Sequence, residues 1–173
     1  NLNALIDELK SYGSEVFFIP ANLANDEDVK CLFNKSIELL GSIHAVITNA
    51  GGDISGDDNN AAGGKALNND FSISLEEHDN IFDRNYRTCL LTLRAFVPYF
   101  KEQKFGKIIT ISSVNASVGV EKETSYAVAK SAVVHLTRCL AKELRSHSIN
   151  VNCLMLGPTK TGRFMATLKG RNE

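Results

Sequence analysis

The sequence lacks an excess of charge of either sign. Its 173 residues contain 19 lysines and arginines against 20 aspartates and glutamates, which gives a formal net charge of −1. A nucleic-acid-binding protein usually has a basic surface, because contacts to phosphate supply most of its affinity. We therefore expect no nucleic-acid partner.

The sequence also lacks long apolar runs. Val16–Ile19 is among the longest, whereas a membrane-spanning helix needs about 20 apolar residues. We therefore expect no membrane partner. Hydrophobic residues make up 43% of the chain and charged residues 23%, which is ordinary for a globular protein and excludes a disordered or fibrous chain. The length corresponds to a single domain, 1–173.

Cysteine is scarce and scattered. Cys31, Cys89, Cys139 and Cys153 lie far apart, and no pair has C-x-x-C spacing. The four histidines are equally dispersed and form no H-E-x-x-H motif. A disulfide framework and a metal site are therefore poorly supported. The pattern predicts buried free thiols in a reducing compartment, and so a cytoplasmic protein.

Two hydrophobic periods alternate along the chain. Helical spacing predicts helices from Leu2 to Gly13, Asp26 to Leu40, Leu75 to Gln103 and Thr124 to about Arg145. Short apolar runs predict strands at Glu15–Ala21, His44–Thr48, Lys107–Ser112 and Ile149–Leu156. Strands that are apolar throughout and alternate with helices indicate a parallel sheet with helices on both faces. The predicted fold is a doubly wound α/β domain, a three-layer α/β/α sandwich.

Three local features refine this prediction. Pro98 suggests a kink or an end near the last turn of the third helix. Thr124 or Ser125 is a suitable N-cap for the fourth helix. Residues 51–70 are rich in Gly, Asn and Asp, which is typical of a loop or linker, and we assign this segment no role.

Tyr126 and Lys130 are the first candidates for chemistry. They lie four positions apart near the start of a predicted helix, so their side chains share one face. A free phenol has a pKa near 10, and both an adjacent ammonium and the positive end of the helix dipole favour the phenolate. Such a tyrosine can give or take a proton near neutral pH. The spacing alone also fits an ordinary pair on a helix surface.

Ser113 lies where a predicted strand ends. Ligands of such sheets bind outside the carboxyl ends of the strands. The loop after Ser113 can fold back, so that this hydroxyl and the Tyr126 phenol face one substrate oxygen and polarise a carbonyl. Turn chemistry at a strand end explains Ser113 equally well.

Together these residues resemble a known family. The motifs, in chain order, are Thr48-Asn49-Ala50-Gly51, Ser113, Tyr126-Ala127-Val128-Ala129-Lys130 and Asn152 to Thr161. This order, with thirteen positions from Ser113 to Tyr126, resembles the short-chain dehydrogenase/reductase family from Leu2 to about Thr161. The resemblance implies an oxidoreductase that transfers a hydride between NAD or NADP and a secondary alcohol or ketone, with a Rossmann-type fold.

The resemblance also implies roles for four residues. Tyr126 would be the acid/base on the substrate oxygen, and Ser113 would hydrogen-bond that oxygen. Lys130 would lower the pKa of Tyr126 and hold the nicotinamide ribose. Asn85 matches the family's helix asparagine, which holds a water linking Lys130 to solvent.

Asn85 has a further signal of its own. It lies on the apolar stripe between Ile81 and Cys89, where a polar side chain is costly unless it has a buried role. The alternative is a position on the solvated side of the helix.

The cofactor-binding positions follow in the same way. Asn49, Ala50 and Gly51 would pack against the adenosine ribose, and Asn22-Leu23 would contact the adenine ring. The positions around the nicotinamide amide match Gly157, Thr159 and Thr161. The family usually has Pro-Gly there, whereas this chain has Gly157-Pro158, so we expect these contacts with a different loop geometry.

Two parts of the family pattern do not occur in these residues. The Gly-rich phosphate turn would precede Asn1, and the substrate lid would follow Glu173. We expect either a truncated chain or, in better agreement with the exposed strand edge that truncation would leave, ends that are disordered around an empty cofactor site.

Two other functions remain open, together with the oligomeric state. The same fold could serve as a catalytically inactive nucleotide-binding or sensor protein, or as a bare structural domain. The complete set of Asn85, Ser113, Tyr126 and Lys130 argues against both. The resemblance further implies a homodimer or homotetramer formed through the helices over 75–103 and 124–145.

Overall fold

The computed structural model describes residues 2–52, 70–161 and 165. Its elements, in chain order, are α1 (Leu2–Ser11), α2 (Asp26–Leu40), β1 (Ala45–Thr48), α3 (Leu75–Phe82), η2 (Asp83–Arg87), α4 (Thr88–Gln103), β2 (Gly106–Ser113), η3 (Val114–Ala116), α5 (Thr124–Glu143), η4 (Arg145–His147) and β3 (Ile149–Leu156). Among the described residues, no helix has both the length and the apolar character needed to cross a membrane. Most of the predicted loop over 51–70 lies outside the described residues.

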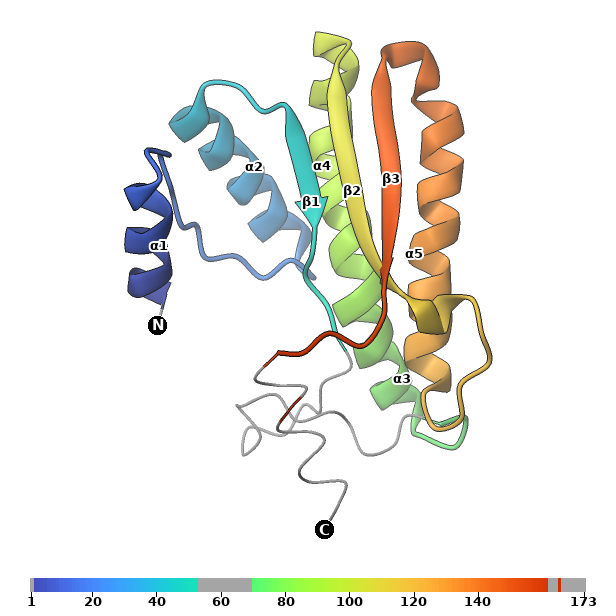
Figure 1. The fold of residues 1–173 in the computed structure, drawn as a ribbon. Helices are drawn as coiled ribbons and strands as arrows, with labels where there is room; N and C mark the ends of the chain where they lie inside the picture. Colours follow the sequence, from blue (N-terminus) through green and yellow to red (C-terminus); the bar gives the residue numbers. More distant parts are fainter. Residues whose placement is uncertain (1, 53–69, 162–164, 166–173) are drawn as a thin grey trace.

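The strands form one parallel sheet in the order β1-β2-β3 (Figure 1). In its register, Thr48 on β1 lies beside Thr110 on β2, which lies beside Cys153 on β3. The parallel α/β class is therefore confirmed, and three of the four predicted strands occur where the apolar runs place them.

One face of the sheet carries the helices. On this face Thr48 Oγ1 contacts the Cys89 sulfur of α4 at 3.2 Å, and Thr110 Oγ1 bonds to Thr137 Oγ1 of α5 at 2.7 Å. The opposite face bears Ile47, which is 59% exposed. Helices on both faces were expected. Among the described strands, β2 is added beside β1 and β3 beside β2, always at the same edge of the sheet. Right-handed crossovers that all run in this direction place their connecting helices on the same face of the sheet.

The apolar core lies between this face and α4 and α5. Phe100, Ile108 and Leu144 are fully buried there. Gly106 is essential to the close packing, because a Cβ at that position would lie 2.6 Å from Cγ of Phe100. α2 packs beside α4, where the rings of Phe33 and Phe96 meet edge to face with 5.1 Å between their centroids.

Glu15–Ala21 is not a strand, contrary to the prediction. A strand needs a neighbour that completes its hydrogen-bond ladder, and no strand lies beside this segment in the part of the chain that the structure describes. Its apolar side chains therefore stay partly in solvent, with Phe18 58% exposed.

The helix predicted over 75–103 is interrupted by η2, a π-helical turn. Pro98 does not end or interrupt it, because α4 continues to Gln103. Pro98 and Arg94 are both exposed, so water can bond the carbonyl that the missing Pro98 N–H leaves free.

The other corrections concern a cap and the thiols. α5 begins after Glu123, so Thr124 and Ser125 lie within its first turn and neither is the N-cap. The four cysteines are free, as predicted, but only Cys89 is buried, while Cys31 and Cys139 are exposed on the outer sides of α2 and α5.

The buried pair of Thr110 and Thr137 generates a stability prediction. Thr137 Oγ1 donates to the Val133 carbonyl at 2.8 Å and therefore accepts from Thr110. T137V leaves the Thr110 hydroxyl to the Asn152 carbonyl, a weak acceptor at 3.5 Å, and we expect it to lower the free energy of unfolding by about 1 kcal/mol. T110V should cost less, because Thr137 keeps its bond to Val133.

Denaturant unfolding of both single variants and of the double variant checks this order. We expect the double variant to be no less stable than T137V, since no buried hydroxyl is then left without a partner. Equal losses from the two single variants, adding up in the double variant, would contradict the assigned direction of the bond.

Candidate active site

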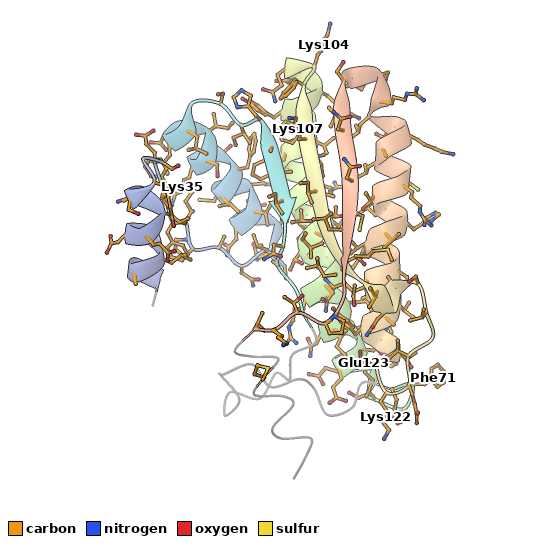
Figure 2. All side chains as sticks on the ribbon, viewed as in Figure 1. Lys35, Phe71, Lys104, Lys107, Lys122 and Glu123 are labelled. Atoms are coloured by element: carbon orange, nitrogen blue, oxygen red, sulfur yellow. The ribbon has the colours of Figure 1, made fainter. Side chains whose placement is uncertain are left out.

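The candidate site lies where β1 and β2 end and α5 begins. Figure 2 labels Phe71, Lys122 and Glu123 at this end of the molecule, and Lys104 and Lys107 at the opposite end. The carboxyl ends of parallel strands are the usual place for ligands in such a sheet. Four polar residues predicted from the sequence, Asn85, Ser113, Tyr126 and Lys130, all belong to elements that meet here.

Asn85 is held by the π-helical turn η2. There the N–H of Thr88 donates to the carbonyl of Asp83, five residues earlier, so the turn contains one residue more than an α-helical turn. Asn85 Nδ2 donates to the Ile81 carbonyl at 3.0 Å. The side chain is 1% exposed, so Asn85 occupies the buried position and the solvated alternative is wrong.

The same amide holds the chain that leaves β1. Asn85 Oδ1 accepts from the Gly52 N–H at 2.8 Å, and Nδ2 donates to the Gly52 carbonyl at 3.1 Å. Gly51 adopts a φ of +135°, and a Cβ there would lie 2.9 Å from Asn85 Oδ1 and 3.2 Å from Lys130 Nζ. Only glycine fits both the conformation and the space.

Lys130 brings a charge into this end of the core. It is 4% exposed, and its Nζ donates to the Ile111 carbonyl of β2 at 3.1 Å. Burial lowers the pKa of Lys130, and the nearby thiols of Cys89 and Cys153 oppose that shift. The ammonium lies 5.8 Å from the centre of the Tyr126 ring, within cation–π range.

The end of β2 is tied to α5 around Lys130. Ser112 Oγ donates to the Lys130 carbonyl at 2.9 Å, and Ser113 follows directly. Ser113 Oγ accepts from the backbone N–H of Asn115 at 3.3 Å. As an acceptor in this bond, Ser113 keeps its hydroxyl hydrogen for another partner.

The predicted adenine-side residues are brought together only in part. Leu23, Asn49 and Ala50 line one cavity of about 240 Å³ beside β1. Asn22 is exposed, and its Oδ1 accepts from the N–H of Ala24 at 3.1 Å, so its acceptor serves its own loop.

The residues predicted around the nicotinamide amide lie after β3. Gly157, Thr159 and Thr161 are all exposed. Thr159 Oγ1 donates to the Gly157 carbonyl at 3.2 Å, and a Cβ on Gly157 would lie 3.9 Å from Val114 of η3. Gly157 thus reaches the turn that follows Ser113.

Sequence reasoning missed several side chains around the site. Arg87 Nε donates to the Ala24 carbonyl at 3.1 Å and connects η2 to the loop after Asn22. His78 Nδ1 contacts Ser125 Oγ at 3.0 Å, and Asn115 Nδ2 donates to Glu123. These contacts span up to 63 positions and follow no local period, so the sequence carried no signal for them.

Comparisons with known proteins agree with this arrangement. A family model described as short chain dehydrogenase matches residues 1–172. The 3-oxoacyl-(acyl-carrier-protein) reductase of Staphylococcus aureus (strain Mu50 / ATCC 700699) is 30% identical over 154 residues, which cover 89% of this chain and 58% of that protein. The enzyme of the same name from Synechocystis sp. is 28% identical over 158 residues, which cover 90% and 58%. The chain thus spans just over half the length of these relatives.

Solved structures share the fold. An NAD+-bound xylitol dehydrogenase superposes with a TM-score of 0.83 at 20% identity, over 95% of this chain and 58% of that one. A 7α-hydroxysteroid dehydrogenase complexed with NADH and 7-oxo glycochenodeoxycholic acid gives 0.82 at 24% identity, over 95% and 59%. The predicted Rossmann-type fold is confirmed.

The space around Gly51 generates a prediction. We expect G51A to lower the free energy of unfolding by about 1–3 kcal/mol, because its Cβ requires both a strained φ and movement of Asn85 or Lys130. G119A is the matched control, since Gly119 has no neighbour within 4 Å of a Cβ and no positive φ. Denaturant unfolding measures both, and equal stabilities would contradict the close approach at Gly51.

Burial of Lys130 generates a pH-dependent prediction. Its folded-state pKa lies below the value of 10.5 for an exposed lysine, so the buried charge destabilises the fold below both pKa values. This penalty begins to shrink as the pH rises above the folded-state pKa and is lost near the unfolded-state value of 10.5. We therefore expect K130M to be at least as stable as the wild type near neutral pH, with an advantage that shrinks toward high pH.

Denaturant unfolding at several pH values from about 6 to about 10 measures this trend. K142M removes an exposed lysine from the same helix and serves as the control. A K130M advantage that stays constant with pH would show that packing, and not the charge, causes it.

Proposed function

The chain belongs to the short-chain dehydrogenase family, and from that premise we propose that its site transfers a hydride between NAD or NADP and a secondary alcohol or ketone. Tyr126 acts as the acid/base. The observation that carries the proposal is the buried Lys130 ammonium beside the Tyr126 ring. The Lys130 ammonium donates to the neutral carbonyl of Ile111, so a phenolate at Tyr126 is the counter-charge that best explains its burial.

The residues at the end of β1 fit a dinucleotide. Asn49 and Ala50 open onto a cavity, and Gly51, which follows them, lets the backbone pass close to Asn85 and Lys130. We assign Asn49, Ala50, Gly51 and Leu23 to the adenosine half of the cofactor. Gly157, Thr159 and Thr161 are assigned to the nicotinamide half, because they follow β3 next to the turn after Ser113.

The catalytic step uses side chains of this chain around one substrate oxygen. Ser113 donates its free hydroxyl hydrogen to the carbonyl oxygen and so orients it. During reduction Tyr126 donates its proton to that oxygen, and during oxidation it removes the proton from the alcohol. The bound nicotinamide supplies or accepts the hydride. Lys130 stabilises the phenolate and binds the nicotinamide ribose.

Asn85 completes this set in a modified role. Its side chain is already engaged by Gly52 and Ile81. Both of its N–H donors are used, so a water that links Lys130 to solvent would have to donate to the second lone pair of Asn85 Oδ1. The amide also holds Gly51 and Gly52 against Lys130.

The substrate class rests on the relatives. The curated relatives reported above are named for reduction of 3-oxoacyl groups carried as thioesters, and the folded neighbours act on other alcohols and ketones. We propose a ketone substrate and take a 3-oxoacyl thioester as the first one to test. We also propose a cytoplasmic homodimer or homotetramer that assembles through the outer faces of α4 and α5, where Val128 is 50% exposed.

The test removes only the phenolic oxygen. In the intact protein, NADH or NADPH oxidation with acetoacetyl thioester should fall by about 10²–10⁴-fold in Y126F, because the proton donor is lost. Y12F is the matched control, since Tyr12 is 76% exposed and far from the site in sequence. Its rate should equal that of the wild type.

S113A should also lose most of its activity, because the substrate oxygen loses a hydrogen-bond donor. Equal rates in wild type and Y126F would refute the catalytic role of Tyr126. Cofactor binding without turnover of any ketone would favour the sensor alternative.

A further inference from the structure

One histidine outside the proposed catalytic and cofactor-binding residues contacts the helix that carries Tyr126. We propose that His78 is a positioning residue, which fixes Tyr126 through a hydrogen bond to Ser125. His78 lies on α3, and its Nδ1 is 3.0 Å from the Ser125 Oγ of α5. This inference rests on the proposed function, because it assigns His78 to the placement of the catalytic tyrosine.

The start of α5 needs such support. Its N-cap is Glu123, which forms no side-chain hydrogen bond to the first turn. The Glu123 carboxylate instead accepts from Asn115 Nδ2. An uncapped first turn leaves backbone N–H groups unsatisfied and tends to fray. Tyr126 lies within this turn, so a contact that holds the turn from outside the helix also helps to place Tyr126.

α3 is well suited to supply that contact. It begins with a capping box, in which Ser74 and Glu77 bond reciprocally to each other's backbone N–H. The N–H of His78 donates to the Ser74 carbonyl at 3.0 Å, so His78 lies in a secured turn. Its ring packs on Phe82 with a distance of 4.7 Å between centroids. The imidazole is therefore fixed from two sides.

Ser125, the other partner in this bond, is equally constrained. Ser125 is 3% exposed, and a buried hydroxyl without a partner is costly. The bond at His78 therefore holds Ser125, and the next residue is Tyr126. The continuous helical segment of α3 and η2 thus makes two hydrogen bonds at the site. His78 bonds to Ser125, and Asn85 bonds to Gly52. These two contacts set the position of Tyr126 relative to Lys130 and Gly51.

Three substitutions separate position from chemistry. H78F keeps a flat ring against Phe82 and removes the hydrogen bond. H78N keeps a polar atom at the location of Nδ1 and can donate or accept, so it should restore the bond whichever partner donates. H135N is the matched control, since His135 is an exposed histidine on α5.

Two measurements on the intact protein are made for each variant. The first is steady-state turnover of acetoacetyl thioester with NADPH and with NADH. The second is amide hydrogen exchange in residues 127–130, where the Ala127 N–H donates to the Glu123 carbonyl at 2.8 Å. We expect H78F to lower kcat roughly 10-fold with little change in KM, because a small displacement of a catalytic group lowers the rate of the chemical step. Exchange in 127–130 should be faster, whereas H78N and H135N should behave as the wild type.

The possible failures are distinguishable. Wild-type kcat and exchange in H78F would overturn the inference, and so would an H78N variant no better than H78F. If the wild type turns over no substrate, the proposed function fails. The exchange rates alone then decide whether His78 holds the first turn of α5.

Discussion

The ammonium of Lys130 is the constraint on which the site depends. It lies almost fully buried at the end of the sheet, where burial lowers its pKa. A lone buried charge is costly, so its surroundings must supply acceptors or a counter-charge. The Ile111 carbonyl supplies one acceptor, and Ser112 fixes the backbone of Lys130 itself. The face of the Tyr126 ring, whose centre lies 5.8 Å from the ammonium, supplies part of the remaining compensation.

The second constraint is the π-helical turn at Asp83–Arg87. A regular helix would pair the Arg84 carbonyl with the Thr88 N–H, four residues later. Here the Thr88 N–H bonds to the Asp83 carbonyl instead, and Thr88 Oγ1 takes the Arg84 carbonyl at 2.9 Å. The Asn85 side chain also bonds to its own helix, at the Ile81 carbonyl. Such turns are unfavourable unless side chains satisfy the displaced backbone groups. Here they do, and the same amide can then hold Gly52.

The sequence predicted the fold where local patterns decide the structure. Helix boundaries at Asp26 and Leu40, and the strand Ile149–Leu156, follow from apolar periods that tertiary contacts did not override. The strand expected at Glu15–Ala21 failed because pairing depends on a neighbour and not on the segment's own residues. The burial of Asn85 could be anticipated from its apolar stripe. The π turn could not, because it depends on which side chains reach the displaced carbonyls. Contacts such as that of His78 with Ser125 join positions far apart in the sequence, so no hydrophobic period or local motif predicts them.

Along the helix-covered face of the sheet, apolar residues give way to polar ones at one level. On β2 the buried residues change from Ile108 to Thr110 and then to Ser112. On β1 and β3 the change occurs in the same row, at Thr48 and Cys153. Toward the amino ends of the strands, the sheet and the helices are held by apolar packing around Phe100. Toward their carboxyl ends, hydroxyls, a thiol and Lys130 must find partners, and each partner fixes a specific geometry. The apolar packing around Phe100 thus offsets the free-energy cost of burying polar groups at the other end of the sheet. That polar end is the part of the fold that can hold a reacting group in place.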